Sequence, residues 1–358
     1  MLIFLEGFKS LVHFKQCLID NATFRLHYKF TFGLLCLASF LQTAKQYFGD
    51  PIDCKVDNKW KDDKDIINTF CWINGTYTLS GQNSLYPGVG ANKTEDRIYH
   101  SWYQWVPFIL FFQALLCYTP HFLWKMWEGG KLKLLLQNFS EKTLDVAPQA
   151  TKARRHIIVG YFMRNRGTHN LYMFQFVFCE FLNLLNLIGQ MYLMDAFFGG
   201  QFSAYGSEVI SMTGGTKDAH PMDKVFPKIA KCSFYSVGYS GTTQHADALC
   251  ILPLNTLNEK IFLGLWFWYF ILLIWTGIYL CCRVVTIASA YSRHLIFCGR
   301  AKSNCREDVA TIMKNLWFGD WFILMQLCKH MDPMVFHDLV VDLAVQMEPK
   351  KRPQITLL

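Results

Sequence analysis

Four apolar stretches, each about the length of a bilayer crossing, constrain this chain more than any other feature. A membrane-spanning helix needs about 20 mainly apolar residues, and the chain is 52% hydrophobic with only 17% charged residues. The stretches are residues 30–47, 103–124, 171–198 and 261–282. The sequence therefore predicts an all-α membrane protein with four transmembrane helices. The first is the weakest of the four, because polar residues crowd its far end.

The distribution of lysine and arginine predicts which segments face the cytosol. Such residues concentrate on cytosolic flanks, and residues 1–29, 125–170 and 283–358 hold four, nine and ten of them. The other two segments, 48–102 and 199–260, balance their basic residues with acidic ones. We therefore predict cytosolic N and C termini, a cytosolic middle loop and two extracellular loops. The net charge of +8 then reflects topology, and no nucleic-acid partner is expected.

Two cysteines lie in each predicted extracellular loop. Cys54 and Cys71 are in the first loop, and Cys232 and Cys250 are in the second. Disulfides persist in an oxidising compartment, so these four are expected to pair. Four cysteines allow three connectivities, and their spacing does not choose among them. Two stapled loops indicate an exposed surface held to a fixed shape.

The first stretch carries small or polar side chains where lipid would favour large apolar ones. Gly33, Ser39, Gln42 and Gln46 are therefore candidates for lining a water-filled pore. The alternative is a short span whose polar end lies among the lipid headgroups.

A polar stripe in the third stretch has a different interpretation. Steps of three or four residues place its members on one side of a helix; they are Glu180, Asn183, Asn186 and Gln190. We favour hydrogen bonds that hold neighbouring helices together, with a pore wall as the alternative.

The cytosolic segments are predicted to form a packed layer of helices. Apolar residues between 309 and 316 recur with helical spacing, and Gly319 is expected to end that helix. Asp332 and Pro333 form a helix-start signal ahead of a second periodic run that reaches Met347.

Catalytic signatures such as His-Glu-x-x-His and Gly-x-Ser-x-Gly are missing from the sequence, so neither enzymatic activity nor a metal or cofactor is expected. Asn74 and Asn92 are acceptor sites for glycosylation in the first extracellular loop. The C-terminal residues 356–358 would suit a PDZ domain, which binds a terminal peptide as an added strand.

Tyr103, Gln104, Trp105 and Val106 open the second stretch and read at first as interfacial aromatic anchors. They also resemble the signature of the innexins, the invertebrate gap-junction proteins, with Trp102 where a tyrosine is usual. The resemblance extends along nearly the whole chain, to insect-type members and virus-borne copies alike. It rests on segments 51–54, 71–72, 87–90, 124–130, 189–192, 226–228, 253–255, 258–260 and 319–322.

The resemblance implies a large-pore channel. Subunits, eight by analogy, would ring a pore to form a hemichannel, alone or mixed with other innexins, within the lipid of the plasma membrane. Two hemichannels of adjacent cells would dock to pass ions and small metabolites. The resemblance also implies that Cys54 pairs with Cys250 and Cys71 with Cys232, that the first span lines the pore, and that residues 1–21 fold into its cytosolic mouth.

Two other functions fit the same four-span topology. One is an undocked plasma-membrane hemichannel that releases small molecules. The other belongs to a different class, a non-conducting adhesion or signalling protein. Dye transfer between paired cells and whole-cell current distinguish the three.

Overall fold

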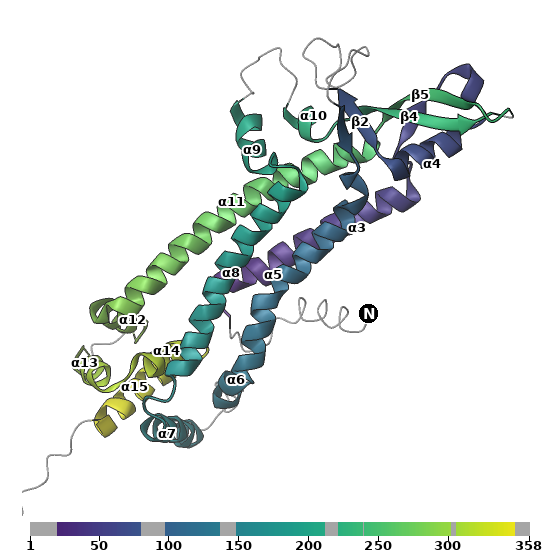
Figure 1. Cartoon of the computed structure of the whole chain (residues 1–358). Coiled ribbons are helices and arrows are strands. Elements are labelled where there is room, and N and C mark those ends of the chain that lie inside the picture. The colour runs from purple at the N-terminus through teal and green to yellow at the C-terminus, as the bar shows by residue number, and fades with distance from the viewer. Residues whose placement is uncertain are drawn as a thin grey trace, which may run out of the picture. The chain divides into compact units, whose positions relative to one another are not determined.

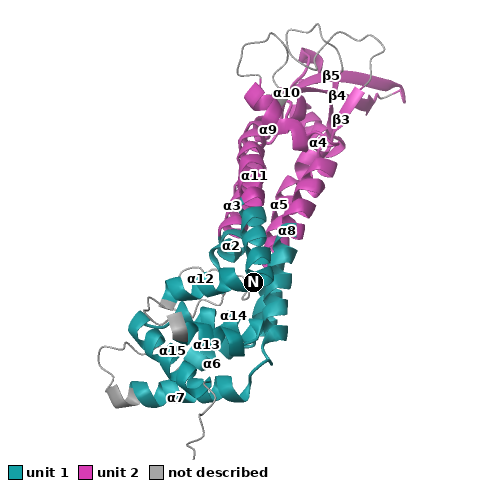
Figure 2. Cartoon of the chain, turned by 90° about the vertical axis from the view of Figure 1, so that its left-hand side faces the viewer, with its two compact units in different colours: residues 1–29, 119–184, 275–358 teal, residues 30–118, 185–274 magenta. Residues whose placement is uncertain are grey.

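The computed structural model consists of two units, shown in separate colours in Figure 2. Unit 1 comprises residues 1–29, 119–184 and 275–358, and unit 2 comprises residues 30–118 and 185–274. The residues that the structure describes are 20–79, 97–136, 148–211, 221–238, 240–301 and 306–347.

Three helical segments among the described residues are long and apolar enough to cross a membrane (Figure 1). The first is Trp102–Glu128, made of the short 3-10 helix η3 (Trp102–Trp105) and α5 (Val106–Glu128). The others are α8 (Asn170–Phe197) and α11 (Pro253–Ala288). They coincide with the second, third and fourth predicted stretches.

The first predicted stretch forms a shorter helix. α3 (Phe32–Phe48) has 17 residues, and it follows α2 (Ala22–Arg25) and a π-helical turn, η1 (Leu26–Thr31). At 1.5 Å per residue α3 alone is about 25 Å long, short of a hydrocarbon core of about 30 Å. The wider π-helical turn separates it from α2, so this stretch is not one continuous α-helix.

A five-stranded antiparallel sheet in unit 2 departs from the all-α prediction. Its strand order is β1-β5-β4-β2-β3. The strands are β1 (Asp53–Lys55), β2 (Thr76–Leu79), β3 (Arg97–His100), β4 (Ile229–Val237) and β5 (Thr243–Ile251). Three of the five are too short to show the alternation by which strands are recognised in a sequence, which explains why the sheet was not predicted.

The helix α4 (Lys64–Asn74) packs against β1 and β4 and completes a substructure that we call the cap, meaning the sheet together with α4 (Figure 1). β5 alternates between buried and exposed residues, so that Ala246, Ala248 and Cys250 point inward. Ala248 and Cys250 belong to a small apolar core to which α4 contributes Ile67 and Cys71.

Unit 2 also contains two short helices, α9 (Phe202–Ser211) and α10 (Pro221–Val225). An aromatic cluster fills the space next to them. The Phe226 ring stacks on Phe262 with centroids 5.5 Å apart, and Trp102 and Phe198 pack edge-on against Phe226. Phe198 and Phe226 directly follow α8 and α10, so these four rings join the ends of those helices to α11 and η3 through apolar burial.

In unit 1, helices that follow α5 and α11 in the chain pack into a layer, in agreement with the predicted helical layer. Its members are α6 (Lys131–Leu136), α7 (Pro148–Arg164), α12 (Ala290–Ala301), α13 (Arg306–Asn315), α14 (Phe318–Cys328) and α15 (Pro333–Met347). The predicted start of α15 is confirmed, because Asp332 Oδ1 accepts a hydrogen bond of 2.9 Å from the Met334 amide.

The expectation that Gly319 ends a helix was wrong. α13 ends at Asn315, and Gly319 lies in the first turn of α14. A Cβ atom at this position would lie 2.4 Å from the Asn170 nitrogen and 2.5 Å from the His169 carbonyl oxygen. Only glycine lets the two backbones approach so closely.

We predict that Gly319→Ala lowers the stability of the purified full-length protein by about 1–3 kcal/mol, because the added methyl meets backbone that cannot rotate away. Thermal unfolding measures the effect. Gly160→Ala is the matched control, since a Cβ there meets nothing within 4 Å and alanine favours the helix interior by about 1 kcal/mol. Equal melting temperatures for the two variants would contradict the close contact at Gly319.

Candidate functional site

Two disulfides join the first predicted extracellular loop to the second. Cys54 is bonded to Cys250 across 196 residues of chain, and Cys71 is bonded to Cys232 across 161 residues. All four cysteines are buried in the cap. In the chain-entropy account, closing a loop of this length stabilises the folded state by about 5 kcal/mol for the first bond, and the second, nested bond adds less.

The sheet and α4 explain how the cysteines reach each other. The β1–β5 register places Cys54 opposite Cys250. Cys71 lies on the buried face of α4, which packs on β4 and brings it to Cys232. Each disulfide is therefore part of the packed core of the cap and not an external staple.

Two signature residues in η3, directly before α5, bind the last turn of α4. The Gln104 side-chain amide donates hydrogen bonds to the carbonyl oxygens of Trp72 and Ile73. The Tyr103 hydroxyl lies 3.5 Å from the Cys71 carbonyl oxygen, and its ring packs on Trp72 with centroids 4.8 Å apart. The last carbonyls of a helix lack partners within the helix, so these two side chains cap α4.

The other two signature residues differ in exposure. Trp105 is 63% exposed, which suits the interfacial anchor that the sequence suggests. Val106 is fully buried, like Tyr103. The anchor interpretation therefore fits Trp105 alone, and the capping of α4 was not predicted from the sequence.

Two of the four candidate pore residues are buried against neighbouring helices of the same subunit. The Ser39 hydroxyl donates to the Pro107 carbonyl oxygen at 2.8 Å, and Gln42 Nε2 donates to Asn258 Oδ1 at 2.5 Å. Both side chains are buried within one chain. Gly33 and Gln46 are half-buried.

Polarity in a span indicates only that a side chain has avoided lipid. In α3 the partner of Ser39 and Gln42 is a neighbouring helix instead of water. Gln42 belongs to a chain of buried amides, in which Asn258 donates to Asn255 at 3.1 Å and Asn255 donates to the Pro227 carbonyl oxygen at 2.8 Å. Asn255 and Asn258 were noticed in the sequence only as part of family-like segments, without this role.

The polar stripe of α8 lies within the helix bundle of each unit, as in the favoured interpretation. In unit 2, Gln190 Nε2 donates to the Gln113 carbonyl oxygen at 3.1 Å, and the Tyr269 hydroxyl donates to Gln190 Oε1 at 3.1 Å. In unit 1, Glu180 accepts two hydrogen bonds from the Arg283 guanidinium group, at 2.9 and 2.8 Å. Asn183 is buried and Asn186 is half-buried.

Several predicted features lie outside the described residues. They are Asn92, most of the N-terminal segment 1–21 and the C-terminal residues 356–358. Asn74, the other glycosylation candidate, is exposed as the last residue of α4, three positions after Cys71.

The comparison with known protein families matches residues 20–347 to the family model described as Innexin. The chain belongs to the innexin family. It is 43% identical to innexin inx2 of Drosophila melanogaster over 350 residues, which cover 95% of this chain and 94% of that protein. It is 42% identical to innexin inx2 of Schistocerca americana (96% and 97% covered) and 40% identical to innexin shaking-B of D. melanogaster (96% and 94% covered).

Innexins are gap-junction channel proteins of the plasma membrane, and this innexin carries the apolar helices of a multi-pass membrane protein. Innexins form oligomeric channels and are not enzymes. The signature that the sequence shares with the family therefore has a structural meaning here, since it fastens the start of a long apolar helix to the disulfide-bonded cap.

We predict that Cys71→Ser lowers the stability of this innexin by about 2–5 kcal/mol, because it removes one of the two bonds between the loops. Cys281→Ser, which changes an exposed free thiol, is expected to leave the melting temperature unchanged. Peptide mapping without reduction should recover the 54–250 and 71–232 pairs. A peptide that joins Cys54 to Cys71 would contradict the connectivity.

A second prediction concerns acidification of the cap. His100 is buried and its Nε2 lies 2.8 Å from Thr78 Oγ1, and burial lowers the pKa of His100 from 6.5 to about 4. The unfolded chain takes up a proton near pH 6.5, whereas the folded chain does so only near pH 4. The free energy of unfolding therefore falls by up to about 3 kcal/mol as the pH is lowered from about 6.5 to about 4.

The measurement is thermal unfolding between pH 7 and pH 4. His100→Gln should flatten the pH dependence, whereas His245→Gln should not, since His245 is exposed on the same sheet. An unchanged slope in His100→Gln would mean that other groups cause the acid sensitivity.

Proposed function

We propose that this innexin is a subunit of a large-pore hemichannel, and that two hemichannels dock through their caps to connect the cytosols of adjacent cells. Ions and small metabolites are the expected permeants, and by family resemblance eight subunits form the ring, alone or with other innexins. The observation that carries the proposal is that both loops contribute to one disulfide-bonded sheet.

Docking of two preformed rings is favoured when the docking surface is already ordered before contact. Ordering flexible loops on association costs about 0.5–1.5 kcal/mol for each immobilised side chain. The cap avoids much of this cost because its two loops are covalently joined and share a buried core. A stiff cap is therefore well suited to repeated docking around a ring.

The proposed topology has four membrane crossings. α5, α8 and α11 meet the length requirement, and α3 serves as the fourth with its polar residues turned toward α5 and α11. An even number of crossings places both termini on the same side, and the basic flanks assign that side to the cytosol.

The burial of Ser39 and Gln42 moves the proposed pore surface to the opposite side of α3. At 100° per residue, Gly33, Leu37, Phe40 and Ala44 lie on that side. Leu37 and Phe40 are exposed in the subunit, and a Cβ at Gly33 would meet nothing within 4 Å. We propose that this face of α3, and not the Gln42 face, borders the conduction path.

Single cysteines test this assignment in channels that lack Cys36. We expect Leu37→Cys and Ala44→Cys to react with water-soluble thiol reagents and to change the current, whereas Ser39→Cys should stay unmodified. Ile274→Cys is the control for a position that is exposed in the subunit but lies on α11. Faster labelling of Ile274→Cys than of Leu37→Cys would assign the pore to another helix.

Paired cells that express the protein test docking. Dye transfer between the cells, with a current that both share, is the expected result. Whole-cell current without transfer would support the undocked hemichannel, and surface protein without either would support the non-conducting adhesion protein.

Glycosylation offers a second test of docking. Asn74 follows the disulfide-anchored Cys71 closely, so we propose that Asn92 is modified more readily and that its sugars oppose docking. Asn92→Gln should then raise dye coupling at equal surface expression, with Asn74→Gln as the matched control. A gel mobility that glycosidase leaves unchanged would contradict the proposal.

A further inference from the structure

In unit 1, a buried carboxylate is paired with an arginine, and further cationic side chains lie near that pair. Glu180 of α8 is buried, and its two oxygens accept hydrogen bonds from Arg283 of α11. The Asn21 side-chain amide at the start of α2 also donates to Glu180, at 2.6 Å. The ring of Phe322 in α14 lies 5.7 Å from the Arg283 guanidinium carbon. Four helices therefore converge on one acidic group.

Lys329 lies within electrostatic reach of Glu180, and Arg25 and Arg300 lie within reach of Lys329. Arg25 lies one turn after Asn21, Lys329 directly follows α14, and Arg300 is in the last turn of α12. The protein packed around the Lys329 ammonium group, together with the nearby Arg283, Arg300 and Arg25, lowers the pKa of Lys329 from 10.5 to about 8. Arg283, Arg300 and Arg25 therefore all lie within electrostatic reach of Lys329.

The charges of this cluster do not balance. The cluster contains four cations and one carboxylate, and that carboxylate already binds Arg283. Within the described part of the chain, Arg25, Arg300 and Lys329 form no ion pair, and the Lys329 ammonium donates only to Gln326 Oε1, at 3.0 Å. All three residues nevertheless keep a substantial part of their surface open to solvent. Like charges held together without counterions repel one another, and a bound anion would relieve that repulsion.

We propose that Arg25, Arg300 and Lys329, placed by the Glu180–Arg283 pair, form a binding site for a polyphosphorylated group. Several phosphate oxygens match several cations, and guanidinium groups bind phosphate in a bidentate manner. Arg283 follows directly after the stretch 261–282, so in the proposed topology the cluster lies at the level of the inner headgroups. The group can belong to a phosphoinositide lipid or to a soluble inositol phosphate.

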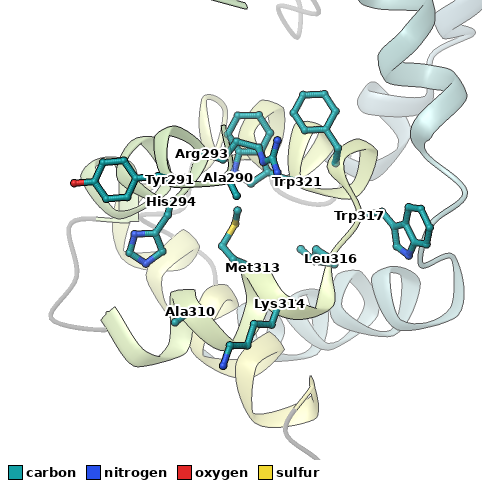
Figure 3. Close-up of a pocket in the computed structure, with 11 residues that line it drawn as sticks. Ala290, Tyr291, Arg293, His294, Ala310, Met313, Lys314, Leu316, Trp317 and Trp321 are labelled. Carbon is teal, nitrogen blue, oxygen red and sulfur yellow. The ribbon is translucent and has the colours of Figure 1, made fainter. Parts of the chain in front are cut away.

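A pocket in unit 1 contains a lysine that serves as the control for substitutions in the cluster. It has a volume of about 350 Å³ and lies between α12, α13 and α14 (Figure 3). Its Arg293 is already engaged, donating to the Thr286 and Ile287 carbonyl oxygens at 3.1 and 2.7 Å. Lys314, also exposed, extends away from Arg293 in this view. Lys314→Gln therefore removes one exposed charge from the same unit without changing the cluster.

The test uses the full-length protein in nanodiscs and measures binding at 150 mM salt. One arm adds inositol hexakisphosphate to nanodiscs of neutral lipid, and the other compares nanodiscs containing phosphatidylinositol 4,5-bisphosphate with nanodiscs of equal charge made with phosphatidylserine. Lys329→Gln and Arg300→Gln should each weaken binding about tenfold, which is the loss of one charge-assisted hydrogen bond, whereas Lys314→Gln should change it less than twofold.

The outcomes separate the two sources of phosphate. Binding of both probes with the same dependence on Lys329 identifies a lipid headgroup site, and binding of the soluble probe alone identifies a cytosolic ligand. Equal binding to phosphatidylserine, equal loss in Lys314→Gln, or no binding to the wild-type protein would overturn the proposal. Gel filtration of each variant verifies that the assembly is intact, so that lost binding is not mistaken for misfolding.

Discussion

Two covalent bonds between distant segments hold the cap together. β1 has three residues, and β2 and β3 have four each, so these strands are too short to be stable by themselves. The hairpin of β4 and β5 provides a longer template, but β1 and α4 reach it from another part of the chain. The disulfides remove the entropy of that long closure, and the buried cysteines then become part of the apolar core.

Inside the helix bundle of unit 2, hydrogen bonds between amide groups fix which helices are neighbours, as the disulfides fix the segments of the cap. Gln42, Asn258 and Asn255 form one chain of hydrogen bonds, and Gln190 and Tyr269 belong to another. Helices in lipid have little hydrophobic reason to prefer one neighbour over another. Directional bonds supply that preference, which explains why the short and polar α3 keeps a defined place beside α5 and α11.

The sequence predicted three of the long apolar helices and the helical layer of unit 1 well, because both depend on local composition and period. It did not predict the sheet, although β5 alternates Ala246, Ala248 and Cys250 with exposed residues. Isolated short strands depend on partners far away in the chain. The pairing of the cysteines came from family resemblance and not from their spacing.

The candidate site could be predicted only in part from the sequence, because the partners of its residues are distant in the chain. Ser39 and Gln42 were recognised as unsuited to lipid, but the pattern does not distinguish water from a neighbouring helix. The Pro107 carbonyl and Asn258 that satisfy them lie 68 and 216 positions away. The capping of α4 by Gln104 was equally hidden, since its acceptors are backbone carbonyls that look alike in every sequence.

That capping has a mechanical consequence. Gln104 and Tyr103 bind the last turn of α4, and Cys71 in the same turn is bonded to β4. α4 therefore links α5 to the sheet through rigid contacts on both sides. No flexible linker separates α5 from α4 at this contact, so a tilt of α5 is not taken up there. It has to be passed on as a displacement of the sheet, so movement of the helix and movement of the cap share one degree of freedom.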